Sequence, residues 1–165
     1  MEIRLNPPDG IPPVFIGMPF EEAVKAAEVW GDVRVLGPTS LDPTVKIQAV
    51  NDGFDVLLIL RDQKTVNAVD VSGPDGDDGD GDDGTDLRVL YDGVDVFRTP
   101  ARQLLPMFAD RGHRIDDTDP ESPVVLDLTI AFSRWTSQDV PVDPEDGLPL
   151  YFTAALVSNE NPRTP

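Results

Sequence analysis

The sequence predicts an α+β domain in which two short helices cover one face of an antiparallel sheet of about six or more strands. Three observations support this fold class. Two segments carry apolar residues at helical spacing between a proline and a glycine, and several others alternate apolar and polar residues as strands do. A chain of 165 residues is also long enough to bury a core without disulfides. We therefore expect a single domain over residues 1–165.

The first predicted helix spans residues 20–30, FEEAVKAAEVW. Pro19 suits the first position of a helix and Gly31 suits its end. The apolar residues of this segment recur at the spacing of one helix face, which predicts a short amphipathic helix. They are Phe20, Ala23, Val24, Ala27 and Trp30.

The second predicted helix lies in TPARQLLPMFADRG, residues 99–112. Thr99 is a suitable N-cap, Pro100 follows it, and Gly112 ends the segment. Pro106 inside it should kink or shorten the helix, because proline lacks the N–H of a helical hydrogen bond. One stripe carries Leu104, Leu105 and Phe108.

Strands are predicted from alternation and from continuous apolar runs. The residues Asn51-Asp52-Gly53 are typical of a hairpin turn between the strands at 45 and 56. The longest alternation runs from Val124 to Ser133 and predicts one strand with a single apolar face: Val124, Leu126, Leu128, Ile130 and Phe132. Further strands are predicted at 45–49, 56–60, 87–91 and 151–157.

The matching positions of proline and glycine suggest that residues 100–131 repeat residues 19–50. A shift of 81 residues places Pro19 on Pro100 and Gly31 on Gly112. If the repeat is real, both helices lie on one face of a shared antiparallel sheet. Because few residues are identical, two similarly punctuated helices could also arise by coincidence.

The segment 73–86 contains DGDDGDGDDGTD, in which seven aspartates repel one another and four glycines add no stiffness. It separates two strand-like runs, so we expect a disordered acidic hairpin loop. Weak calcium binding is an alternative, with Asp78, Asp80 and Asp82 as candidate ligands, but the glycine and glutamate of an EF-hand loop are missing from the required positions. Recruitment of a basic partner is another. We also expect a flexible tail at 159–165.

The overall charge is -18, and it stays strongly negative without this segment. Such a charge repels nucleic acid and anionic membranes and favours basic partners, although it also serves solubility. No cysteine, apolar leader or membrane-length apolar run is present. We expect a cytoplasmic protein without a cofactor.

Catalytic motifs are absent from the sequence: no nucleophile elbow and no phosphate-binding glycine loop occurs. His113 is the only histidine and follows the second helix, where a cation meets the helix dipole. Acid–base catalysis by His113 with a nearby carboxylate remains an alternative, with a ligand pocket beside it.

A partner-binding surface is predicted on the polar face of the strand at 124–133. Parity places Trp135 on that face with Asp127 and Thr129, and Arg134 is adjacent. A tryptophan on a polar sheet face is a candidate interface anchor. Alternatively, Trp135 folds under the proline-rich loop 136–149.

The residues Ile16-Gly17-Met18-Pro19, followed by Glu21-Glu22-Ala23-Val24, resemble the helix-opening signature of the β-lactamase inhibitory proteins and of small outer-membrane assembly lipoproteins. Proline stands here where serine or threonine is usual. The resemblance implies tandem helix-plus-sheet units. The acidic, cysteine-free composition is also similar to that of bacterial immunity proteins, which implies a non-catalytic function in binding or inhibiting a basic protein.

Overall fold

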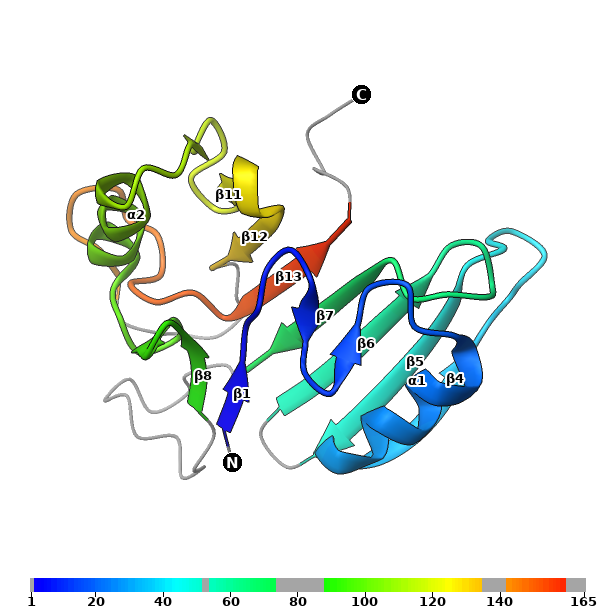
Figure 1. Ribbon diagram of the computed structural model, residues 1–165. Helices are drawn as coiled ribbons and strands as arrows, with labels where there is room; N and C mark the ends of the chain where they lie inside the picture. Colours follow the sequence, from blue (N-terminus) through cyan, green and yellow to red (C-terminus); the bar gives the residue numbers. More distant parts are fainter. Residues whose placement is uncertain (1, 52–53, 74–87, 135–141, 160–165) are drawn as a thin grey trace.

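An antiparallel sheet of eight strands forms the framework of the molecule, as the computed structural model shows (Figure 1). The structure describes residues 2–51, 54–73, 88–134 and 142–159. The predicted α+β class is confirmed. In spatial order the strands are β10 (Ile115–Asp116), β11 (Val124–Val125), β12 (Ile130–Ser133), β13 (Ala154–Ser158), β7 (Ala68–Ser72), β6 (Phe54–Leu60), β5 (Val45–Asn51) and β4 (Asp32–Leu36).

Two helices and two small sheets cover one face of this sheet (Figure 1). The parallel pairing of β1 with β8 joins the start of the chain to its middle. The covering elements are α1 (Phe20–Ala27) with the 3-10 turn η1 (Glu28–Trp30), α2 (Ala101–Asp110), the hairpin β2 (Gly10–Ile11) with β3 (Val14–Phe15), and the sheet of β1 (Glu2–Arg4), β8 (Arg88–Tyr91) and β9 (Val94–Asp95).

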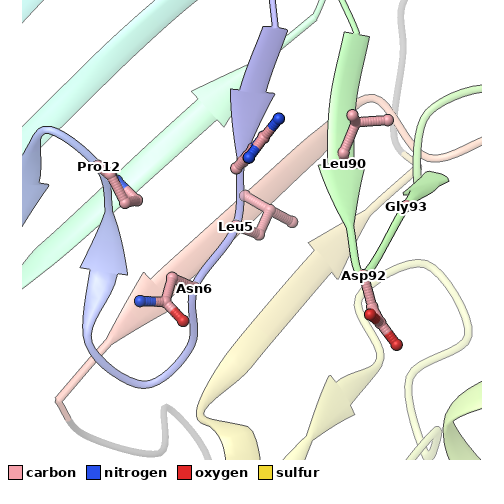
Figure 2. Close-up of a pocket in the computed structure, with 7 residues that line it drawn as sticks. Leu5, Asn6, Pro12, Leu90, Asp92 and Gly93 are labelled. Carbon is pink, nitrogen blue, oxygen red and sulfur yellow. The ribbon is translucent and has the colours of Figure 1, made fainter.

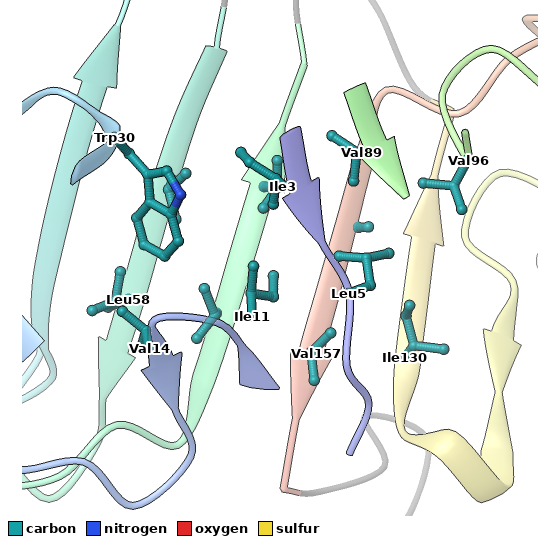
Figure 3. Packing of buried hydrophobic residues seen from close by; sticks show 14 of the residues in the cluster. Ile3, Leu5, Ile11, Val14, Trp30, Leu58, Val89, Val96, Ile130 and Val157 are labelled. Atoms are coloured by element: carbon teal, nitrogen blue, oxygen red, sulfur yellow. The ribbon is translucent and has the colours of Figure 1, made fainter. Parts of the chain in front are cut away.

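The core lies between these covering elements and the large sheet. Strand register places one side chain from each strand in a single row on this face, and the row is buried from Ile47 to Val125. Figure 3 shows Ile3, Leu5 and Ile11 lying over these strands. The whole row is Val35, Ile47, Leu58, Val69, Val157, Ile130, Val125 and Ile115.

The predicted repeat corresponds to a repeated order of elements. A hairpin, a helix and four antiparallel strands occur first as β2-β3, α1 and β4 to β7, and then as β8-β9, α2 and β10 to β13. The two sets of four strands meet where β7 pairs with β13, with Val69 opposite Val157. Both helices therefore lie on one face of a shared sheet, as the repeat predicts.

Local sequence explains where the helices begin and end. Pro19 and Pro100 are the N-caps rather than the first helical residues, and Pro106 is accommodated within α2. Gly31 follows η1 with φ of 152°, a conformation that favours glycine. Gly112 follows α2 with φ of 88°. Neither described helix has the length and apolar character needed to cross a membrane.

The continuous strand predicted for residues 124–133 is wrong. A 3-10 turn, η2 (Leu126–Leu128), separates β11 from β12, and Thr129 adopts a left-handed conformation with φ of 50°. The hydroxyl of Thr129 donates to the carbonyl oxygen of Ser158 at 2.5 Å, which holds this turn against β13. The alternation therefore does not define one apolar face along the segment.

The hairpin predicted around the aspartate-rich segment is also wrong. The strand before it, β7, lies in the large sheet between β6 and β13, whereas the strand after it, β8, pairs with β1 and β9. The segment thus connects two different sheets. Residues 74–87 and 160–165 lie outside the described part of the chain, so the predictions of disorder at 73–86 and of a flexible tail at 159–165 remain predictions.

Candidate interaction surface

The second face of the large sheet is covered by none of the described helices or strands (Figure 1). We call this surface the open face. Its side chains alternate with the core residues, so Leu57 and Leu156 are half-buried whereas Leu58 and Val157 are fully buried. One row of this face crosses all eight strands, and among its members Val124 is buried. The row is Arg34, Gln48, Leu57, Asp70, Leu156, Ala131, Val124 and Asp116.

Asp70 lies at the middle of this row, on strand β7. Its direct neighbours across the two ladders are Leu57 on β6 and Leu156 on β13. No described side chain forms an ion pair or a hydrogen bond with its carboxylate. Burial among these neighbours raises the pKa of Asp70 to about 6.

An ionised carboxylate in this position destabilises the folded chain, because burial removes water from the charge and no cation among the described residues replaces it. Core packing does not need an acid here, since an alanine or threonine would also suit a strand. Carboxylates with such perturbed pKa values concentrate at functional sites. Asp70 is therefore the strongest candidate for a binding residue on the open face.

Asp127, predicted as a partner-binding residue, lies on η2 and contacts the segment after α2. Its Oδ2 is 2.7 Å from Nδ1 of His113, and its Oδ1 accepts the backbone N–H of Arg114 at 2.8 Å. Partial burial opposes ionisation, but these hydrogen bonds outweigh it and lower the pKa of Asp127. The pair orients the imidazole and joins α2 to the turn.

The other predicted partner-binding residues do not gather on one exposed surface. Thr129 bonds to Ser158, and Arg134 is only 4% exposed, with Nη2 at 2.5 Å from Asp146. Arg134 also donates to the carbonyl oxygens of Pro120 and Pro149. Trp135 lies outside the described residues, so its role as an anchor remains a prediction.

A pocket of about 430 Å³ lies beside β1, at the end of the small sheet (Figure 2). His113 is not among its lining residues, although Asp92 in the lining pairs with Arg111 at 2.6 Å, close to His113 in the sequence. The predicted ligand pocket beside His113 is therefore not this pocket. Its lining is Arg4, Leu5, Asn6, Pro12, Leu90, Asp92 and Gly93.

No cluster of histidine and carboxylate ligands suited to a metal ion occurs within the described ranges. The candidate calcium ligands Asp78, Asp80 and Asp82 lie outside these ranges, so calcium binding there remains a prediction.

Reasoning from the sequence missed Asp70, although a signal for it was present. The run Ala68-Val69-Asp70-Val71 sets one aspartate inside an apolar strand segment, where β-propensity disfavours it. Only the register shows that two leucines flank this aspartate.

Comparison with known proteins adds no relative: no family model matches the chain, and neither curated proteins nor solved structures give a match.

Proposed function

We propose that this chain is a non-catalytic protein-interaction module that binds a basic protein partner through the open face. The observation that carries the proposal is Asp70, a carboxylate between two leucines with no cation beside it among the described residues. A function as an immunity or inhibitor protein is consistent with the composition.

The chemistry of the open face fits an arginine or lysine side chain of a partner. A guanidinium or ammonium group at Asp70 would replace the lost hydration, and its aliphatic stem would pack on Leu57 and Leu156. The charge of -18 would speed the encounter with a basic protein and make the association rate depend on salt. Binding would thus turn an unfavourable buried charge into a paired one.

The experiment compares capture of basic proteins from the source organism at low salt by three immobilised chains: the unaltered chain, Asp70→Asn and Glu21→Gln. Glu21 is an exposed residue of α1, so its variant makes the same charge change away from the open face. We expect the unaltered chain and Glu21→Gln to retain the same basic protein. Asp70→Asn should bind the purified partner at least about thirtyfold more weakly, because a desolvated charge pair is broken.

Recovery of no basic protein, or equal affinity of Asp70→Asn and Glu21→Gln for the recovered partner, would contradict the proposal. The melting temperature of each variant shows whether a change in binding arises from unfolding.

The contact between His113 and Asp127 favours a second candidate function, in small-molecule binding or acid–base chemistry. A carboxylate that holds Nδ1 leaves Nε2 to act on a ligand, and no described residue bonds to Nε2. A fragment library followed by NMR tests this candidate. A ligand that shifts the signals of both Asp92 and His113 supports it, and a screen without such a ligand counts against it.

A further inference from the structure

β4 forms one edge of the large sheet, and within the described residues it pairs with β5 alone. In an antiparallel ladder the backbone N–H and C=O groups of alternate residues point away from the neighbour. β4 therefore presents a row of unpaired groups along five residues, Asp32–Leu36. The opposite edge strand, β10, has only two residues, which leaves little backbone for another strand to bind.

The exposed edge of β4 carries two charged side chains, Asp32 and Arg34, but it lacks the proline and lysine that often prevent strand pairing. No proline or lysine occurs in the strand, and its two apolar end residues, Val35 and Leu36, are 47% and 40% exposed. Val29, in the preceding turn η1, is 58% exposed. A long edge with exposed apolar side chains is suited to pairing with another strand.

The charges of β4 indicate which strand fits this edge. We infer that β4 pairs antiparallel with β4 of a second copy of this chain, with Val33 opposite Val33 across a twofold axis. In this register Asp32 of each copy lies opposite Arg34 of the other, so two ion pairs form on one face of the joined sheet.

Neighbouring registers are unfavourable. A shift of one residue would place core-face residues of one copy on the open face of the other. A shift of two residues places Arg34 opposite Arg34 or Asp32 opposite Asp32, which are like charges in direct cross-strand contact. The favoured register also places Val35 opposite Gly31, which has no side chain to collide with it.

Net charge opposes this association, because each copy carries -18. Salt screens this repulsion, because charges further apart than the Debye length of about 8 Å at physiological salt interact weakly. The close ion pairs are screened less. Self-association should therefore strengthen with salt, whereas binding of a basic partner should weaken. The inference does not depend on the proposed function, and the two salt dependences distinguish them.

Sedimentation equilibrium of the full chain at physiological and higher salt tests the inference. The chains are the unaltered protein, Asp32→Arg, Arg34→Asp, the double exchange of both residues, and the control Arg88→Asp. Arg88 is exposed on β8, away from β4. Each single change at β4 should raise the dissociation constant of the dimer about tenfold or more, because two attractive pairs become repulsive.

The double exchange should restore the dimer, because the same two ion pairs form with their partners exchanged. Circular dichroism confirms that each variant is folded. A chain that stays monomeric up to millimolar concentration would overturn the inference. So would a dimer that single reversals leave intact, or one that the double exchange fails to restore.

Discussion

The two halves of the large sheet repeat one order of elements but differ in strand length. β5 and β6 have seven residues each, whereas β10 and β11 have two each. The first half is therefore joined by long backbone ladders. In the second half four aromatic rings pack in a chain, with successive centroids 4.9, 5.8 and 5.0 Å apart: Tyr91, Phe108, Phe132 and Phe152.

Polar side chains also hold the second half together. The buried guanidinium of Arg134 joins β12 to the segment around Asp146, and Thr129 joins η2 to the end of β13. The difference teaches that one topology can be stabilised either by backbone pairing or by side-chain contacts between short strands. Truncation of one of these side chains should therefore destabilise the second half more than a comparable truncation destabilises the first.

The largest expected effect is that of Phe108→Ala. Phe108 is fully buried on α2 and contacts the rings of Tyr91 and Phe132. Its truncation should lower the free energy of unfolding by about 3–5 kcal/mol in urea titrations. Leu105→Ala, at a half-buried position of the same helix, is the control and should cost less. In Phe108→Ala, amide hydrogen exchange should accelerate more in β12 than in β5 and β6. Equal acceleration in all three strands would contradict the proposed difference between the halves.

Equivalent glycines of the two halves provide the next comparison. A Cβ at Gly31 would overlap the carbonyl oxygen of Val50, whereas a Cβ at Gly112 meets no atom within 4 Å. Gly112→Ala should therefore cost about 1 kcal/mol, for its positive φ alone. Gly31→Ala should cost about 2–3 kcal/mol, because backbone must also move. If both variants lose the same free energy of unfolding in denaturant titrations, the backbone of β5 moves away from the added methyl group without cost and the prediction is wrong.

Asp70→Asn should stabilise the chain at pH 7 by about 1–3 kcal/mol, because it removes a desolvated charge. The folded pKa of about 6 lies above the ordinary value of 3.8, so the penalty is full above pH 6 and absent below the ordinary pKa. The melting temperatures of the variant and the unaltered chain should therefore converge as the pH falls toward 3.8. A gain that is independent of pH would mean that the charge is not responsible.

The smallest expected effect is that of Asp127→Asn, under about 1 kcal/mol, because the side chain is 37% exposed and solvent screens its contact with His113. The folded pKa of Asp127 is lowered, so its contribution is present above the ordinary value and is lost as the pH falls through the folded pKa. Thermal melts at neutral and strongly acidic pH should show this loss. A larger effect in acid than at neutral pH would contradict the assignment.

Features fixed by neighbouring residues were predicted well from the sequence. Pro19 and Gly31 delimit the first helix with its 3-10 turn, and the pairing of β5 with β6 around residues 52–53 was expected. Features that depend on distant residues were not. The interruption at η2 depends on Ser158, which is 29 residues from Thr129, and β1 finds its partner β8 far along the chain.

The candidate site also combines a feature visible in the local sequence with features that depend on distant residues. An aspartate in an apolar strand is visible in the sequence, but its position between Leu57 and Leu156 depends on two ladders, one of them with β13. The predicted grouping of Asp127 and Thr129 with Trp135 rested on strand parity, which the turn at η2 removes. Alternation cannot reveal this turn, because Leu128 within it still packs against the core as a strand residue would.

The place of β13 between β7 and β12 has a consequence for synthesis on the ribosome. Until residues 154–158 leave the exit tunnel, the central seam of the sheet cannot close, and β7 exposes a free backbone edge beside Val69 and Val71. A nascent chain in which β7 has formed but β13 has not yet emerged is therefore at risk of aggregation. Chains that stop before Ala154 should require chaperones or degradation rather than fold as a stable first half.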